Sequence, residues 1–158
     1  MSDPITKNEE KQFVVFQLSK ETYGVDIGQV SEIITMQQIT KVPHTIEFIE
    51  GIINLRGRVI PVVDLRKRFG LPCDEITRNT RIVVIEIGGN TLGMIVDGVS
   101  EVLRISGDIV EAPPPAITNV DADYLEGVAK LEDRLIILLN LEKVLTKQEQ
   151  AELENMVN

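Results

Sequence analysis

Few residues in this chain could act as nucleophiles or metal ligands. The 158 residues include a single histidine, His44, and a single cysteine, Cys73. An activated nucleophile needs a neighbouring base, and a structural zinc site needs four thiolate or imidazole ligands. The sequence therefore offers no internal disulfide, no thiolate or imidazole metal site and no nucleophile with a suitable base. We interpret His44 as a loop or surface residue and Cys73 as incidental, and we expect no metal and no cofactor.

Basic side chains, in contrast, are concentrated in the stretch "GIINLRGRVIPVVDLRKRFG", residues 51–70. They are Arg56, Arg58, Arg66, Lys67 and Arg68. Because Asp64 is the one acid between Arg56 and Arg68, this window carries a charge of +4 in a chain whose formal net charge is −9. Binding to a nucleic-acid phosphate backbone requires an excess of positive charge, so we expect no nucleic-acid partner. An acidic protein surface could be steered to this window instead.

The sequence contains an internal duplication. "VVFQLSKETYGVDIGQVSEII", from Val14, aligns at an offset of 69 with "VVIEIGGNTLGMIVDGVSEVL", from Val83. "FIEGIINLRGRVIPVVDLRKRF", from Phe48, aligns at an offset of 76 with "YLEGVAKLEDRLIILLNLEKVL", from Tyr124. The offset changes around "EAPPPAITNVDADY", which indicates a longer proline-rich connection in the second copy. We predict two repeat lobes, at about residues 13–70 and 82–145.

Two carboxylates, Glu50 and Asp64, could in principle form an acid–base pair. However, Asp64 begins a helix-like segment, where an aspartate caps the first turn. Glu50 recurs as Glu126 in the second copy, which indicates a scaffold role. The "GGN" stretch lacks the lysine of a phosphate-binding loop. We therefore predict no catalytic residues, with a small β-barrel enzyme as the alternative hypothesis.

The elements that position these residues are mainly short strands. Runs rich in Val and Ile, separated by Gly, Asn, Asp and Pro, are typical of small barrels. "SKET", "GGNT" and the Arg56-Gly57 dipeptide predict hairpin turns, and Gly28 and Gly98 predict bends within longer strands. Pro61 cannot donate to a β-ladder, so its strand should lie at an edge or pair irregularly.

Helices are expected only at the periphery. Asp64 should cap a short helix that stops at Gly70, and Asn140 should cap its counterpart. Thr146 and Glu149 form a capping-box pattern that predicts a C-terminal helix over 147–158. We predict an all-β fold of two similar small barrels packed together. Because a lobe of about 65 residues is marginal alone, burial between the lobes should supply much of the stability.

The two copies differ at the tip of one hairpin, where Arg56 and Gly57 align with Glu132 and Asp133. A rigid hairpin presents the planar guanidinium with little entropy left to lose, which suits a carboxylate or carbonyl on a partner. We interpret Arg66, Lys67 and Arg68 as a solvated rim of the first lobe. Glu32 could pair with a basic group on a partner or with an arginine of this chain.

Three segments, "FIEGIINLRGRVIPVVDLRKRFG", "LGMIVDGVSEVL" and "YLEGVAKLEDRLIILLNLEKVL", resemble the CheW family of chemotaxis scaffold proteins. The resemblance runs from about Phe13 to Leu145, and "EGIINLRGRVIPVVDLR" is its most specific part. It implies one CheW-like domain over 12–146, made of two SH3-like five-stranded β-barrels with a possible strand exchange, after a flexible N-terminus over 1–11. No phosphotransfer, ATP-binding or receiver segment is seen, so the free-standing adaptor is the matching member.

The resemblance also implies a non-enzymatic function. Such adaptors couple the cytoplasmic tip of chemoreceptors to the regulatory domain of the histidine kinase CheA. Carried over by motif, the receptor-binding residues are Val30, Glu32, Gly51 and Arg56. Ile39 and Val42, in "QQITKVP", are the candidate kinase-binding residues.

The N-terminus "MSDPITKNEEKQ" lacks the features of a signal peptide, and no apolar run approaches the roughly 20 residues of a membrane span. We expect a cytoplasmic protein without membrane insertion, recruited to receptor arrays at the inner membrane.

Overall fold

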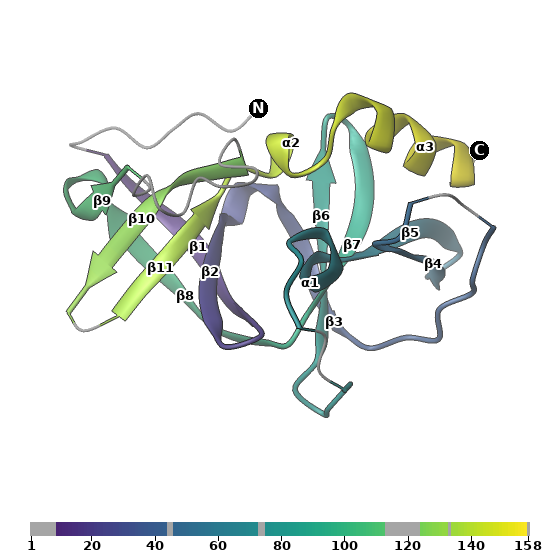
Figure 1. The fold of residues 1–158 in the computed structure, drawn as a ribbon, viewed down its shortest axis with the longest axis horizontal. Coiled ribbons are helices and arrows are strands. Elements are labelled where there is room, and N and C mark those ends of the chain that lie inside the picture. Colours follow the sequence, from purple (N-terminus) through teal and green to yellow (C-terminus); the bar gives the residue numbers. More distant parts are fainter. Residues whose placement is uncertain (1–8, 44–45, 73–74, 113–123, 133, 158) are drawn as a thin grey trace.

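The computed structural model describes residues 9–43, 46–72, 75–112, 124–132 and 134–157 (Figure 1). His44, Cys73, Asp133 and the three consecutive prolines 113–115 lie outside these ranges. The strands are β1 Glu10–Leu18, β2 Glu21–Asp26, β3 Val30–Thr35, β4 Ile49–Leu55, β5 Arg58–Asp64, β6 Arg81–Ile87, β7 Asn90–Val96, β8 Gly98–Ser106, β9 Val110–Glu111, β10 Leu125–Leu131 and β11 Arg134–Leu139. The α-helices are α1 Leu65–Arg68, α2 Leu141–Val144 and α3 Lys147–Val157, and two 3-10 turns are η1 Ile27–Gln29 and η2 Gly107–Ile109.

The strands form two sheets, on the left and right of Figure 1, that pack against each other. Sheet A has the order β8-β1-β2-β11-β10-β9, and sheet B has the order β3-β6-β7-β5-β4. The all-β prediction with short peripheral helices is confirmed. Sheet A contains five long strands and the two-residue β9.

Each sheet takes strands from both copies of the repeat. The β1–β2 hairpin of the first copy lies in sheet A with β8, β10 and β11 of the second copy, whereas the β6–β7 hairpin of the second copy lies in sheet B with β3, β4 and β5. The chain crosses between sheets just before β3 and just before β8, at the predicted bends near Gly28 and Gly98. The exchanged unit is thus a whole hairpin from each copy, and each sequence repeat is divided between the two sheets.

The connections indicate that both sheets curl toward closure. β8 and β9 are the two ends of the strand order in sheet A, yet only the three residues of η2 separate them in the chain. In sheet B, Thr40 follows β3 and forms an antiparallel bridge with Ile52 of β4 at the opposite end of the strand order. A flat sheet could not bring its end strands so close, whereas a barrel does so by construction.

The buried apolar residues of the described ranges form three clusters. Phe13, Val15 and Ile105 contribute to the interior of sheet A, and Ile60 and Val62 to that of sheet B. The largest cluster contains residues of both sheets, including Phe16 and Leu18 of β1 and Val83 and Ile85 of β6. Because β1 and β6 bury both of their faces, their sequences read as continuous apolar runs. Burial between the sheets therefore forms the main core.

Turn and cap predictions are confirmed locally. Asp64 Oδ1 accepts a hydrogen bond from Arg66 N at 2.9 Å, and Asn140 Oδ1 accepts one from Glu142 N at 3.1 Å. Thr146 and Glu149 form the reciprocal capping box, with N to oxygen distances of 2.8 and 3.1 Å.

Pro61 lies in an interior strand, so the edge alternative was wrong. β5 pairs with β4 on one side and with β7 on the other. The parallel pairing with β7 begins only at Val62, and this allows a proline immediately before it.

Candidate functional site

The tip of the β4–β5 hairpin presents the candidate arginine to solvent. Arg56 and Gly57 both have positive φ angles, 54° and 85°, as in the two-residue turns that match strand twist. Gly57 N donates to Asn54 Oδ1 at 2.7 Å, which closes the turn. Glu132 has φ 49° at the equivalent position, so the second copy keeps the backbone conformation while it reverses the charge.

Glu32 forms an ion pair with Arg56 of this tip, which is one of the two pairings predicted for it, while its role in receptor binding stays a prediction. The Arg56 side chain is 69% exposed and that of Glu32 30% exposed. An ion pair this exposed contributes about 0–1 kcal/mol to stability. It orients the guanidinium along the rim of sheet B, where the group remains accessible.

In the second copy, the equivalent glutamate pairs with an arginine at a different position of the hairpin. Glu101, the counterpart of Glu32, pairs with Arg134 at 3.0 Å. Arg134 aligns with Arg58, not with Arg56. Arg58 instead donates from a terminal guanidinium nitrogen to Thr91 Oγ1 at 2.6 Å. Duplication thus preserved an acid–arginine pair in each sheet but moved the arginine by two residues.

Val30 and Gly51, the other candidate receptor-binding residues, are less exposed than Arg56. Val30 is partly buried against the cluster between the sheets. Gly51 is buried, with φ 150°, and a Cβ there would collide with the carbonyl oxygen of Thr40. The close approach of two backbones therefore explains this glycine, since no side chain could fit without displacing the Thr40–Ile52 bridge.

The prediction that Arg66, Lys67 and Arg68 form a solvated rim was wrong for Arg66, which is only 4% exposed. Its guanidinium contacts Asp64 Oδ2 at 3.0 Å and Asp97 Oδ1 at 2.8 Å. A buried arginine requires such carboxylates, because an unpaired charge in the core is very costly. Asp97 lies between β7 and β8, 31 residues away in the chain, so sequence spacing gave no signal for this network.

Arg68 also lies mostly against the protein, with its side chain 14% exposed. Its Nε donates to the carbonyl oxygen of Val144 at 3.0 Å, and its guanidinium lies 5.6 Å from the ring centre of Phe48 and 6.0 Å from that of Tyr124. Lys67 forms an ion pair with Glu50. The basic window is therefore largely neutralised within the fold, and its tip, Arg56, is the most exposed of its ion-paired cations.

Stacked aromatic rings extend the contact between Arg68 of the first copy and Tyr124 of the second. Tyr23 stacks between Phe16 and Phe69, with ring centres 6.1 and 5.9 Å away, and Phe69 stacks on Tyr124 at 4.6 Å. Burial, with smaller contributions from Tyr124 and Glu21, raises the pKa of Tyr23 to about 12. Tyr23 thus remains neutral at physiological pH, as its place in the main core requires.

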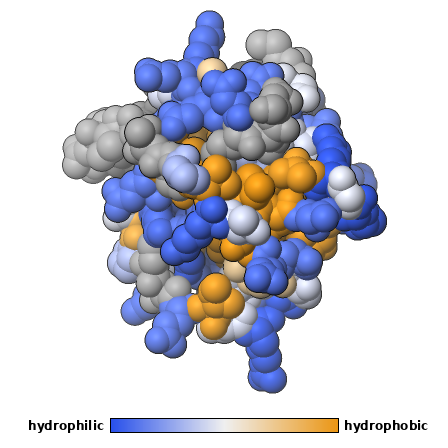
Figure 2. All heavy atoms as spheres, turned by 90° about the vertical axis from the view of Figure 1, so that its right-hand side faces the viewer, coloured by the Kyte–Doolittle hydropathy of each residue, from blue (hydrophilic) through white to orange (hydrophobic). Residues whose placement is uncertain are grey.

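Figure 2 shows a gathering of apolar side chains at the sheet B end of the molecule. Ile39 packs on the interior cluster of sheet B, and Val42 lies in the segment between β3 and β4. Both are partly buried. Ile34, Met36, Ile39 and Leu55 pack on the interior cluster of sheet B while keeping part of their surface accessible. Val59 of the same sheet is 44% exposed. The Thr40–Ile52 bridge fixes the segment that carries Ile39.

Comparison with known proteins gives a match over nearly the whole chain. The family model of the CheW-like domain matches residues 12–149. The chain belongs to the CheW family. It is 36% identical over 146 residues to the chemotaxis protein CheW of Klebsiella aerogenes, which covers 92% of this chain and 88% of that one. It is 34% identical over 158 residues to CheW of Treponema pallidum, with coverage of 97% and 93%.

A solved structure of a CheW protein supports the fold. The crystal structure of the scaffolding protein TtCheW from Thermoanaerobacter tengcongensis matches with a TM-score of 0.79 and 44% sequence identity. The match covers 92% of this chain and 90% of TtCheW. In this CheW-family chain, none of the helices within the described ranges is both long and apolar enough to cross a membrane. The described residues likewise contain no cluster of three or more His, Cys, Asp or Glu suited to a metal ion.

Proposed function

We propose that this protein is a non-catalytic scaffold that couples chemoreceptors to the histidine kinase CheA. The observation that carries the proposal is the match to the CheW-like domain along residues 12–149, together with the likeness to a structure described as a scaffolding protein. Recruitment to receptor arrays at the inner membrane follows from receptor binding, without membrane insertion.

The receptor side of the proposal rests on the rim of sheet B. Arg56 is exposed, held by Glu32, and carried on a short turn of defined geometry. Such a group loses little conformational entropy when it binds a carboxylate or carbonyl on the cytoplasmic tip of a receptor. Val30 would add apolar contact, and Gly51 would act by holding the Thr40 segment close to β4.

The kinase side rests on the apolar end of sheet B. Ile39, like Met36 and Leu55, packs on the interior cluster of sheet B and stays partly exposed, and Val42 follows three residues later in the chain. Figure 2 shows a gathering of apolar side chains at this end. A contiguous apolar surface is typical of a protein–protein interface. The regulatory domain of CheA is the expected partner. The two sets of residues adjoin at Gly51 and Ile39, so receptor and kinase would bind neighbouring parts of sheet B.

The test is a pull-down with a receptor tip fragment and the CheA regulatory domain, using wild type, Arg56→Glu and Glu132→Arg. Arg56→Glu copies the residue of the second lobe and should weaken receptor binding while the melting temperature remains nearly unchanged. Glu132→Arg is the matched change in the other lobe and should affect receptor binding much less. Wild-type protein that binds neither partner would refute the proposal. Equal receptor affinity of folded Arg56→Glu would remove Arg56 from the site.

A further inference from the structure

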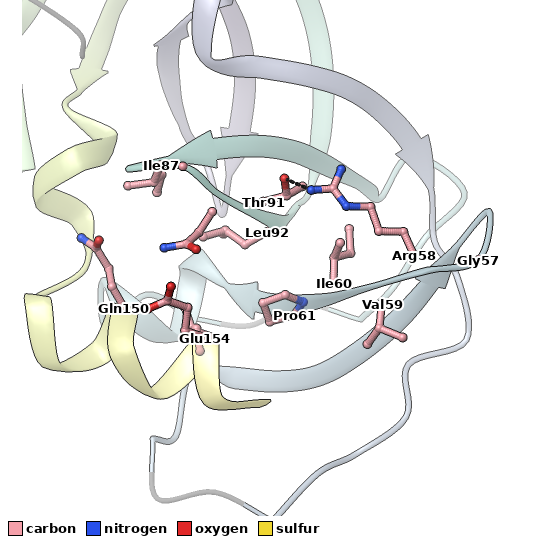
Figure 3. A pocket seen from close by; sticks show the side chains of 13 residues that line it. Gly57, Arg58, Val59, Ile60, Pro61, Ile87, Thr91, Leu92, Gln150 and Glu154 are labelled. Carbon is pink, nitrogen blue, oxygen red and sulfur yellow. Dashed lines mark hydrogen bonds between the residues drawn. The ribbon is translucent and has the colours of Figure 1, made fainter. Parts of the chain in front are cut away.

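A cavity of about 470 Å³ lies between α3 and sheet B (Figure 3); it shares Val59 with the apolar end of sheet B but contains none of the candidate receptor-binding or kinase-binding residues. Its walls come from the first half of β5, the turn between β6 and β7, and the inner face of α3. The apolar lining residues are Val59, Ile60, Pro61, Ile87, Leu92 and Leu153. The other lining residues are polar or glycine, so the site combines both kinds of surface, and its volume is within the range of small-molecule sites.

The cavity belongs to one sheet only, because the described residues that follow α1 contain no counterpart of α3. α1 is followed by a connection to β6 that contains no helix in residues 69–72 and 75–80, the part the structure describes. α3, by contrast, follows α2 directly and covers sheet B next to β5 (Figure 1). Within the described residues, α3 therefore distinguishes the second copy from the first.

Arg58, which lines this cavity, also differs from its counterpart Arg134 in the second copy. Arg134 is neutralised by Glu101 at 3.0 Å. The equivalent carboxylate, Glu32, is engaged by Arg56 instead. Within the described residues Arg58 makes no ion pair, and it donates only to Thr91, which in turn donates to Glu86 at 3.1 Å. Because Arg56 at the hairpin tip engages Glu32, Arg58 has donors that no carboxylate of the described chain uses directly.

We propose that the cavity binds a small organic monocarboxylate with an apolar body, whose carboxylate pairs with Arg58. The guanidinium offers parallel donors that match the two carboxylate oxygens. The apolar body lies against Val59, which is 44% exposed, and beside Ile60, Leu92 and Leu153, which also line the cavity. This function goes beyond the coupling of receptor and kinase and does not depend on it.

The opposite wall limits the ligand to one negative charge. Figure 3 shows Gln150 and Glu154 projecting from α3 on the side away from Arg58 and Thr91. Glu154 makes no ion pair among the described residues and lines the cavity. A second carboxylate at the far end of the ligand would approach it and be repelled. A methyl or other neutral end is therefore favoured at this wall.

The test is an NMR titration of the full-length protein with octanoate, octanedioate and octylamine, following backbone amide shifts. Octanoate should give saturable shifts confined to Gly89, Thr91, Leu92 and Leu153. Octanedioate and octylamine should bind more weakly. Arg58→Gln should weaken octanoate binding about 10-fold or more, since a hydrogen bond to a charged group is lost. The matched variant Arg134→Gln should bind octanoate as wild type does.

A second variant tests the charge at the opposite wall. Glu154→Gln should bind octanedioate several-fold more tightly and octanoate about as before. Octanoate shifts that do not saturate, that spread over the surface, or that persist equally in folded Arg58→Gln would overturn the proposal. An equal effect of Arg134→Gln would overturn it too, as would tighter binding of octylamine. Because the protein is measured alone, these outcomes are independent of receptor and kinase binding.

Discussion

Removing the guanidinium of Arg66 should destabilise this protein far more than the same change at Arg56. Arg66 and Asp64 are 4% and 3% exposed, and Asp97 completes the network with its side chain 16% exposed. Arg66→Met leaves two carboxylates without their cation in a largely dry site. Breaking a buried ion pair from one side costs about 3–5 kcal/mol. That is a large share of the roughly 5–15 kcal/mol by which domains are stable.

Arg56→Met is the matched control, because it removes an arginine from an ion pair with a carboxylate in the same sheet. Its side chain is 69% exposed, so the expected cost is below about 1 kcal/mol. Urea unfolding of both variants gives the two free energies, and thermal unfolding should show a drop of about 10 °C for Arg66→Met. Asp97→Asn in the Arg66→Met background should recover part of the loss, since it removes one unpaired charge.

The Arg66 network also bears on how the sheets are held together. Asp97 Oδ2 accepts a hydrogen bond from Ser19 N in the β1–β2 turn at 2.6 Å, while its other oxygen contacts Arg66. The network therefore joins α1, the crossing between β7 and β8, and a hairpin of sheet A. If Arg66→Met costs no more than Arg56→Met, burial does not determine the strength of these ion pairs, and this reasoning is refuted.

Three further predictions follow from the same structure. Gly51→Ala should lower the free energy of unfolding in urea by at least about 2 kcal/mol, because it combines a positive φ with a backbone collision. Gly57→Ala, whose Cβ would meet no atom within 4 Å, should lower it by about 1 kcal/mol. Equal costs would contradict the close-approach argument. The pKa of Tyr23 is raised to about 12, so its neutral form stabilises the fold below pH 10, and this contribution is lost as pH rises from 10 toward 12. Tyr23→Phe should therefore lose about 2 kcal/mol less stability than wild type over that interval. Parallel alkaline unfolding curves of the two proteins would exclude the effect. Val42→Glu should weaken binding to the CheA regulatory domain with little change in melting temperature, and unchanged affinity would place the kinase contact elsewhere.

Local sequence signals predicted most of the elements. Asp64, Asn140 and Thr146 occur immediately before short helices, and each accepts the capping hydrogen bond expected of it. Gly57 and Gly88 occupy turns with positive φ. Such features depend on a few neighbouring residues and their allowed dihedral angles, so a short stretch of sequence is enough to recognise them.

Contacts between distant segments could not be predicted from local sequence signals. Nothing near Arg66 in the sequence distinguishes it from Arg68 or Lys67, because its second carboxylate comes from Asp97. Likewise, Glu32 could be assigned to Arg56 only once β3 and the β4–β5 tip were seen at one rim. The receptor and kinase residues remain predictions that rest on family resemblance and on these positions.

By itself, the sequence determined that the chain is duplicated, that it consists of short strands with small capped helices, and that its two hairpin tips carry opposite charges. Only the tertiary structure decided which hairpin joins which sheet. The β1–β2 and β6–β7 hairpins have nearly the same apolar pattern, so the sequence does not distinguish which sheet each one joins. The choice depends on how the crossings near Gly28 and Gly98 let both sheets bury β1 against β6, and that packing involves residues about 70 positions apart.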